Sequence, residues 1–297
     1  MPTGFVGIFA ATVTPMSSAE DVDYDAIGPL ADRLIAAGVA GLVPCGGTGE
    51  FSALSSEERR EVTRAFIEAA GGRVPVIPHT GALSTRETID LTVRAEALGA
   101  AAAMVVPPFY DPLSWRELYA HYEAVAKAVR IPIVLYNMPG STKVDLRPEQ
   151  AAELAGIDGI RYIKDSSGNL STVARLLDRF GDRISLMNGA DSLAFHAFAL
   201  GAKSAVWGAA NLAPRACVEL HRAVVIDDDI ARGRDLWRRL WPVTDALETP
   251  GIGYAAAVKY GCEVVGHPAG PPRRPILPLD DAFRARLDAV LAPFIGA

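Results

Sequence analysis

The chain has 297 residues, of which 50% are hydrophobic and 22% are charged, and its formal net charge is -6 at pH 7. This composition excludes a disordered chain and indicates one large globular unit, or two small ones, with an ample core. Because no block of basic residues interrupts the acidic excess, we expect neither nucleic acid nor an anionic membrane as the main partner.

The first apolar stretch, residues 5–13, lacks a basic flank and is too short to span a bilayer, so it predicts a strand rather than a signal peptide or membrane segment. The cysteines at 45, 217 and 262 stand far apart and outside any CxxC pair. We therefore expect no disulfide framework, no zinc ribbon and a cytoplasmic protein. The five histidines show no HxH or HExxH spacing, so no metal is predicted.

Short apolar runs of strand length recur along the chain. Each is apolar on both faces, which is typical of parallel strands that helices cover. The runs are GIFAATV from residue 7, AGLVPC from 40, VPVIP from 74, AAAMVVP from 101, IPIVLYN from 131, GIRYIK from 159, ISLMNG from 184 and SAVWG from 204. The sequence therefore predicts eight strands.

Amphipathic segments with recognisable ends separate these runs. A serine followed three residues later by a glutamate, which is typical of a helix N-terminus, occurs at 55–58, 84–87 and 114–117. Gly38, Gly99 and Gly201 follow apolar stretches and are expected to end helices in a left-handed turn. This repeated unit predicts an α/β fold, a closed (β/α)8 TIM barrel. No GxGxxG follows the first strand to favour an open dinucleotide-binding sheet.

The residues beyond about Pro214 exceed what an eighth barrel helix needs. Two apolar-periodic stretches, residues 230–247 and 281–295, predict extra C-terminal helices packed on the barrel. We place the barrel core in residues 1–213 and these helices in residues 214–297. Because no change in composition marks a linker, we expect a single structural unit.

The predicted strand ends are polar and rich in glycine. In a barrel of this kind, the carboxyl ends of the strands and the loops after them form the active face. These ends carry GGTGE at 46–50, HTG at 79–81, PPFY at 107–110, YN at 136–137, Lys164, and NGAD at 188–191. The candidate functional residues therefore lie at this face.

Lys164 ends an apolar run and precedes the hydroxyl-rich turn DSSGN. The alternative is a lysine whose long side chain simply reaches solvent. If buried, its pKa would fall; a change from about 10.4 to about 7.5 corresponds to roughly 4 kcal/mol of disfavoured charge. The neutral amine would attack a carbonyl carbon and form a Schiff base. Tyr136, at the end of the preceding strand, is the candidate proton carrier, unless it is a core tyrosine.

Three other candidates are weaker. The glycine loop at 46–50 could bind an anion through backbone N–H groups and the Thr48 hydroxyl, or it could be a plain tight turn. His79 could carry a proton or bind a substrate hydroxyl, or it could be structural. Cys45 has no evident base partner and is interpreted as a small buried residue.

These motifs together resemble the dihydrodipicolinate synthase and N-acetylneuraminate lyase family of lysine Schiff-base aldolases and lyases. The matching motifs are CGGTGE at 45–50, PPFY at 107–110, YNMP at 136–139 and IKDSSGN at 163–169, and the match covers nearly the whole chain. The resemblance implies that Lys164 forms a covalent imine with a 2-oxo acid, without a separate cofactor. It also implies that Tyr136 relays protons.

The resemblance extends to further site residues and to assembly. It implies that Gly47 and Thr48 hold the substrate carboxylate, and that Gly189 and Val206 line the site with backbone groups. Tyr110 would reach across a subunit interface into a neighbour's site. Because members of the family are commonly tetramers, we expect a homotetramer.

Two positions depart from the lysine-biosynthetic synthase of this family. That enzyme has a hydroxyl residue where this chain has Gly47, so its relay of a threonine and two tyrosines is broken here. It also has an arginine at the substrate-binding position of Ser141, and a serine cannot supply that bidentate charge. We therefore interpret the chain as a lyase, an aldolase or dehydratase, that acts on a pyruvate-type 2-oxo acid, specifically a 2-oxo sugar acid in catabolism.

Three alternatives stay open. The chain could be a 4-hydroxy-tetrahydrodipicolinate synthase despite these departures, or a deaminating lyase acting on a hydroxylated cyclic imino acid. It could also be a non-catalytic barrel that binds a sugar acid, because one fold hosts many functions. The sequence identifies the electron sink, but it leaves open which bond breaks.

Overall fold

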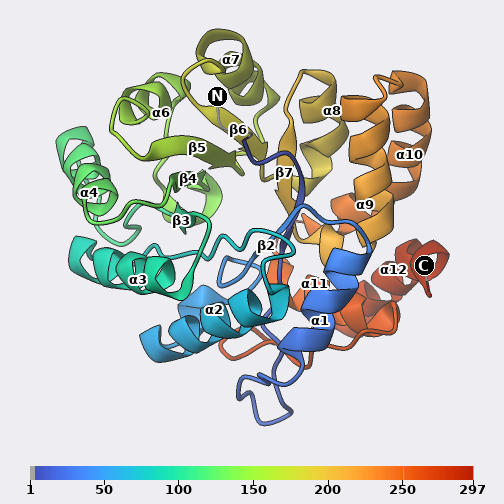
Figure 1. Cartoon of the computed structure of the whole chain (residues 1–297). Coiled ribbons are helices and arrows are strands. Elements are labelled where there is room, and N and C mark those ends of the chain that lie inside the picture. Colours follow the sequence, from blue (N-terminus) through green and yellow to red (C-terminus); the bar gives the residue numbers. More distant parts are fainter. Residues whose placement is uncertain (1–3, 250, 297) are drawn as a thin grey trace.

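A parallel sheet rolled into a barrel forms the centre of the computed structural model, which describes residues 4–249 and 251–296 (Figure 1). Its strands are β1 (Gly7–Ala11), β2 (Gly41–Val43), β3 (Ala103–Val105), β4 (Ile133–Asn137), β5 (Ile160–Asp165), β6 (Ser185–Asn188) and β7 (Ser204–Trp207). They are hydrogen-bonded in the order β2-β1-β7-β6-β5-β4-β3. β2 and β3, at the two ends of this order, are not hydrogen-bonded to each other, so one more strand can lie between them.

The predicted third strand, residues 74–78, and His79 directly after it close the sheet between β2 and β3. Parallel bridges join Leu42 of β2 to Val76, and Met104 of β3 to His79. The segment is not a regular strand because it contains two prolines, which have no N–H to donate. All eight predicted runs therefore take part in the sheet, and the predicted (β/α)8 barrel is confirmed.

Helices surround the barrel on the outside (Figure 1). They are α1 (Ile27–Ala36), α2 (Ser56–Ala70), α3 (Thr85–Leu98), α4 (Trp115–Lys127), α6 (Pro148–Leu154), α7 (Leu170–Phe180), α8 (Ala194–Ala199) and α9 (Pro214–His221). The short helix α5 (Pro139–Thr142) lies in the loop after β4. Single 3-10 turns occur at Phe51–Ala53, Asp191–Leu193, Ala209–Asn211 and Ala292–Phe294, and a π turn at Arg222–Ile226.

The predicted helix ends agree with the structure, with one exception. Two predicted capping boxes, at the starts of α2 and α4, form in full. At the start of α3, Ser84 Oγ accepts the Glu87 N–H, but the Glu87 carboxylate accepts a hydrogen bond from Ser56 Oγ at 2.8 Å instead. The full box predicted there was wrong because α2 offers a competing donor. All three glycines predicted to end helices have positive φ angles.

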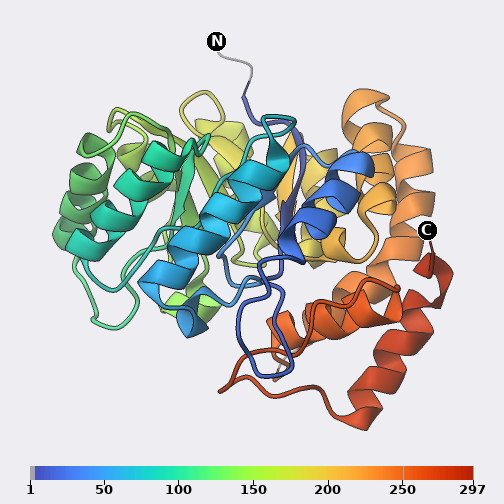
Figure 2. The same cartoon turned by 60° about the horizontal axis from the view of Figure 1, so that its bottom comes forward.

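Three further helices, α10 (Ile230–Leu247), α11 (Tyr254–Val264) and α12 (Asp281–Leu291), follow the barrel. Figure 2 shows α11 and α12 together beneath one side of it. Helix α10 has the predicted bounds, and α12 with the turn after it covers the second predicted stretch. Helix α11 was missed because most of its surface is buried, so it lacks the polar face of an amphipathic helix.

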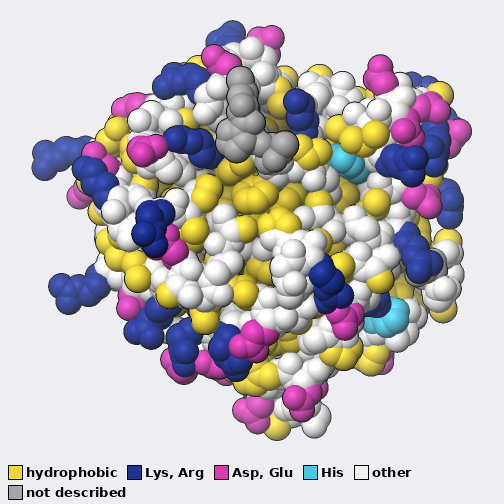
Figure 3. Space-filling model, in the orientation of Figure 1, with side chains coloured by type: hydrophobic (Ala, Val, Ile, Leu, Met, Phe, Trp, Pro, Cys, Tyr) yellow, Lys and Arg dark blue, Asp and Glu magenta, His cyan; other side chains and the backbone are white. Residues whose placement is uncertain are grey.

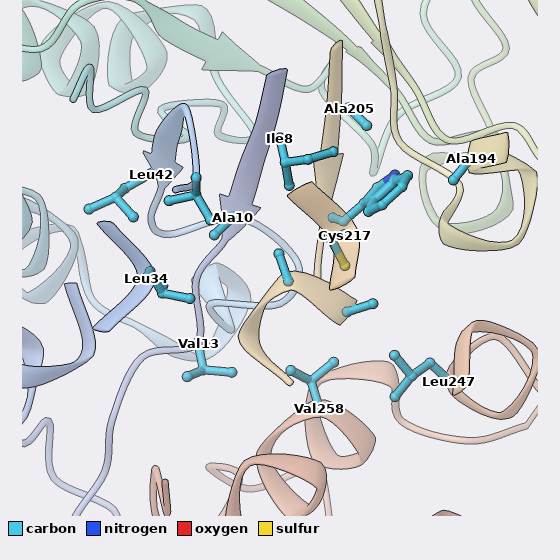
Figure 4. Close-up of a cluster of buried hydrophobic side chains, with 14 of the residues drawn as sticks. Ile8, Ala10, Val13, Leu34, Leu42, Ala194, Ala205, Cys217, Leu247 and Val258 are labelled. Carbon is cyan, nitrogen blue, oxygen red and sulfur yellow. The ribbon is translucent and has the colours of Figure 1, made fainter. Parts of the chain in front are cut away.

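Apolar side chains form two clusters, one inside the barrel and one between the sheet and the helices. Along β1 the side chains alternate, since Phe9 lies in the inner cluster. Ile8 and Ala10 lie in the outer one (Figure 4). Val134 of β4 and Tyr162 of β5 also belong to the inner cluster. Residues two positions later on the same strands therefore point into the mouth of the barrel.

Charged side chains of both signs are interspersed on the face shown in Figure 3. Among the residues that the structure describes, no helix is long and apolar enough to cross a membrane, and no cluster of His, Cys, Asp and Glu could hold a metal ion. Within the described residues, all three cysteines are buried and none forms a disulfide. Burial raises the pKa of Cys45 to about 11, so its thiol is not poised as a nucleophile.

Candidate active site

Lys164 and Tyr136 lie side by side inside the mouth of the barrel. They are register partners on β5 and β4, and Lys164 Nζ lies 4.1 Å from the centroid of the Tyr136 ring. Both side chains are buried, with exposed fractions of 5% and 3%. Across the described residues, no carboxylate lies within ion-pair distance of the Lys164 amine. The amine is therefore free to meet a ligand in the barrel mouth.

The hydroxyl of Tyr136 has no oxygen partner in the described chain. It donates to Met138 Sδ at 2.9 Å, and a thioether is a weak acceptor. Gly47 lies near this hydroxyl, because among the described residues beyond its chain neighbours a Cβ added there would have Tyr136 Oη, at 3.9 Å, as its only contact within 4 Å. The position from which a hydroxyl residue would face Tyr136 is therefore open space.

The glycine loop follows β2 and forms a tight turn. The Glu50 N–H donates to the Gly47 carbonyl at 3.1 Å, and Glu50 itself has a φ of +58°. Thr48 is buried, and within residues 4–249 and 251–296 no acceptor is hydrogen-bonded to the N–H groups of Gly47 and Thr48. The loop is thus a tight turn that leaves two N–H donors without a partner, and anion binding by these donors stays a prediction.

The loop after β6 packs against the Lys164 side chain. A Cβ at Gly189 would lie 2.8 Å from Lys164 Cε and would overlap Ser166 Oγ. Ser166 Oγ donates to the Gly189 carbonyl at 2.8 Å. Only glycine fits this position without moving the lysine. Val206 of β7 belongs to the inner cluster and forms part of the floor beneath the mouth.

Two predicted site residues do not reach this cluster within the single chain. Tyr110, on the loop after β3, is 84% exposed. Ser141 is exposed on the short helix α5. The nearby cation Lys143 donates to the carbonyl of Gly140 at 3.0 Å, so it is turned toward its own loop.

His79 is more deeply placed than the sequence indicated. It is 1% exposed, and its ring lies 4.4 Å from the Phe51 ring and 6.0 Å from the Tyr136 ring, between centroids. Burial, followed by the cations Arg59 and Lys164, holds the pKa of His79 well below its usual range, with a small opposing effect from the Cys45 carbonyl. The imidazole is therefore neutral.

A buried acid and a tyrosine, which the sequence did not single out as a pair, lie next to the mouth. Asp191 Oδ2 accepts hydrogen bonds from the Tyr254 hydroxyl and the Ala209 N–H, both at 2.8 Å. Burial and then Glu248 raise the pKa of Asp191 to about 7, and Lys164 opposes this shift. Asp191 was visible as a strand-end polar residue, whereas no sequence signal pointed to Tyr254, which comes from the unpredicted α11.

Comparisons with known proteins agree with this architecture. The model of the Dihydrodipicolinate synthetase family matches residues 4–293. The 4-hydroxy-tetrahydrodipicolinate synthase of Thermomicrobium roseum is 44% identical over 288 residues, which are 96% of this chain and 93% of that protein. These similarities span nearly the whole chain.

Two solved structures are also similar in fold and sequence. The chloride-inhibited dihydrodipicolinate synthase from Acinetobacter baumannii, complexed with pyruvate, has a TM-score of 0.92 and 36% identity, covering 97% of this chain and 98% of that one. YagE, a prophage protein of the dihydrodipicolinic acid synthase family from E. coli K12 in complex with pyruvate, has a TM-score of 0.92 and 31% identity, covering 98% of both chains.

Proposed function

Because the chain belongs to the dihydrodipicolinate synthetase family, as its motifs predicted, we propose that it is a lyase in which Lys164 forms a Schiff base with a pyruvate-type 2-oxo acid. The observation that carries this proposal is the buried pair of Lys164 and Tyr136, with the amine 4.1 Å from the ring centroid. Two similar structures are complexes with pyruvate, which supports this ligand class.

The chemistry begins when the free electron pair of the Lys164 nitrogen attacks the 2-oxo carbon and forms a carbinolamine. Tyr136 moves the proton from nitrogen to oxygen. Tyr136 then protonates the departing hydroxyl, so that water leaves and a protonated imine remains beside the phenolate. A bond at C3 breaks, and its electron pair enters the imine to give an enamine. The imine itself is the electron sink.

The glycine loop would hold the carboxylate of the 2-oxo acid. The free N–H groups of Gly47 and Thr48, and the Thr48 hydroxyl, are donors of the kind that bind anions. This loop and Lys164 lie at the same end of the barrel, so the 2-oxo carbon of a bound acid would face the amine. The assignment explains why the loop leaves two donors unpaired.

Two finer functions remain candidates, and different observations favour them. The curated relatives at 44% and 39% identity carry the name 4-hydroxy-tetrahydrodipicolinate synthase, which favours a condensation of pyruvate with an aldehyde over the sugar-acid interpretation. Gly47 and the exposed Ser141 favour instead the lyase acting on a 2-oxo sugar acid, since neither supplies the hydroxyl or charge of that synthase.

The primary test is borohydride reduction in the presence of pyruvate, followed by peptide mass spectrometry. We expect a mass gain on Lys164 in the wild-type protein and in the control Lys143→Ala, and none in a folded Lys164→Ala variant. If pyruvate and longer 2-oxo acids leave Lys164 unmodified in the folded wild type, the non-catalytic barrel replaces the lyase.

Turnover assays then separate the finer functions. Release or consumption of pyruvate is measured with aspartate semialdehyde, with 2-oxo sugar acids and with hydroxylated cyclic imino acids. Condensation at a rate like that of a synthase would overturn the argument from Gly47 and Ser141. Cleavage or dehydration of a sugar acid, without condensation, would reject the synthase.

A homotetramer is the proposed assembly. Tyr110 is an aromatic side chain left 84% exposed at the active face, which an interface with a second copy would cover. Light scattering of the wild type should give the mass of four chains, and Tyr110→Arg should lower it. A monomeric wild type would reject the assembly. The reduced, buried thiols fit the proposed cytoplasmic location.

A further inference from the structure

We propose that His79 is a further substrate-binding residue, whose Nε2–H donates to an oxygen on C4 of the bound 2-oxo acid. That oxygen would occupy the space which Gly47 leaves open beside Tyr136. This inference rests on the proposed Schiff-base function and deepens it, because it selects 2-oxo acids that carry an oxygen on C4 over those that lack one.

The register of the closing strand directs His79 into the barrel. His79 forms a parallel bridge with Met104, and bridge partners project to the same face of a sheet. Met104 belongs to the inner cluster, and so does Ile77, two residues before His79. Both relations place the imidazole among the inward-facing side chains, with its ring 6.0 Å from that of Tyr136.

The contacts of His79 indicate which of its nitrogen atoms carries the proton. Arg59 Nη2 lies 3.4 Å from Nδ1 and also donates to the His79 carbonyl at 2.9 Å. A guanidinium has only donors, so Nδ1 accepts and the proton of the neutral ring sits on Nε2. Nε2 is buried and has no hydrogen-bond partner among the described residues. The Cys45 carbonyl lies near enough to the ring to raise its pKa slightly, but it forms no hydrogen bond with Nε2, so this donor is available to a ligand.

The open space at the glycine loop and the His79 ring both neighbour Tyr136. Among the described residues, a Cβ at Gly47 would have Tyr136 Oη as its one contact beyond the chain neighbours, and a Cβ at Gly46 would lie 3.5 Å from Met104 Cε, whose residue is bridged to His79. The Tyr136 hydroxyl, meanwhile, donates only to Met138 Sδ. An oxygen atom in this space would give Tyr136 a stronger partner and could accept the free His79 N–H.

The C4 oxygen fits this position chemically. After Tyr136 has given its proton to the departing water, its phenolate can accept the proton of a C4 hydroxyl. The C3–C4 bond then breaks, its electrons enter the imine, and C4 becomes an aldehyde carbon. The His79 Nε2–H donates to this oxygen throughout and is not itself transferred. In the condensation direction the same donor would polarise the aldehyde.

A matched pair of ligands tests the proposal without requiring turnover. Borohydride trapping is measured at graded concentrations of 2-oxoglutarate and of 4-hydroxy-2-oxoglutarate, which differ only in the C4 hydroxyl. The wild type should be half-trapped at about tenfold less of the hydroxylated acid, the discrimination expected from one good hydrogen bond. His79→Phe keeps an aromatic ring beside Phe51 and should abolish the preference.

The control is His121→Phe, which removes another buried imidazole whose Nε2 is also unpartnered, but from the outer helix α4. It should keep the tenfold preference, and His79→Gln, which restores an N–H donor, should recover part of it. Equal preference in His79→Phe and the wild type, no preference in the wild type, or adducts with pyruvate alone would each overturn the proposal. Absence of adducts with all three acids would instead reject the Schiff-base function.

Discussion

Lys259 Nζ lies 2.6 Å from Glu50 Oε1, and both side chains are almost fully buried. This ion pair joins helix α11 to the glycine loop after β2, across more than two hundred residues of sequence. Glu50 also accepts the Arg273 N–H at 2.7 Å, and Arg273 donates to the Ala53 carbonyl at 3.0 Å. The C-terminal segment therefore positions the loop proposed to hold the substrate carboxylate.

Lys259→Met should destabilise the protein by about 3–5 kcal/mol, because it leaves the buried Glu50 carboxylate without its partner. Denaturant unfolding measures this change. The control Lys127→Met breaks an exposed pair with Glu123 and should cost no more than about 1 kcal/mol. Adding Glu50→Gln to Lys259→Met should recover part of the loss. If the loss of unfolding free energy in the double variant equals the sum of the losses in the two single variants, the pairing is contradicted.

The buried Asp191 should make the protein less stable as pH rises. Its folded pKa of about 7 lies above the ordinary value of 3.8 for an aspartate, so the folded state binds the proton more tightly. This contribution is fully present below about pH 4 and is lost as pH rises through 7. The denaturant concentration at the unfolding midpoint of the wild type should fall as the pH is raised from 5 to 8.

Asp191→Asn removes this titrating group and should give a flatter pH profile over the same range. Asparagine can still accept from the Tyr254 hydroxyl, so the local packing is largely retained. Identical slopes in the two proteins would show that Asp191 does not take up a proton on folding.

Gly189→Ala should lower the rate of imine formation by about 100-fold, because its Cβ would displace the Lys164 stem and a small misplacement has this effect. The rate of borohydride trapping with pyruvate measures it. Gly28→Ala is the control, since among the described residues no atom beyond its own turn of helix lies within 4 Å of a Cβ there, and its φ is not positive. Equal trapping rates in both variants would reject the contact.

Tyr136→Phe should reduce turnover by about 100- to 10,000-fold through loss of the proton carrier. The imine should still form, slowly, because Lys164 keeps its place beside the ring. Tyr162→Phe, which alters a tyrosine of the inner cluster two residues before Lys164, serves as the control and should stay active. Wild-type turnover in Tyr136→Phe would mean that another group relays the proton.

Much of the fold follows from local sequence. Runs apolar on both faces predicted the strands, since a parallel strand between barrel interior and helices has no polar side. The same logic placed Lys164 and Tyr136 at neighbouring strand ends. Helix α11 was missed because a buried helix shows no amphipathic pattern, and the box at Ser84 failed because its outcome depended on a donor in another helix.

The remaining site features depend on contacts between distant parts of the chain. The pairs Glu50 with Lys259 and Asp191 with Tyr254 form only once the C-terminal helices pack, so no local pattern marks them. The tautomer of His79 depends on how α2 turns Arg59 toward the barrel. Sequence identified His79 as a candidate, but only the packing shows that one of its nitrogen atoms is unused.

Pro75 and Pro78 weaken the hydrogen bonding of the closing strand to β2 and β3, and we call this part of the barrel the seam. Leu42 and Met104 donate their amides to the carbonyls of Pro75 and Pro78, but neither proline can donate in return. A sheet opens most easily where backbone hydrogen bonds are missing. The amides of Leu42 and Met104 should therefore exchange with deuterium faster than those of β4 and β5. The seam ends at His79. A ligand bound to His79 would hold the barrel closed at this point and slow the exchange of these two amides.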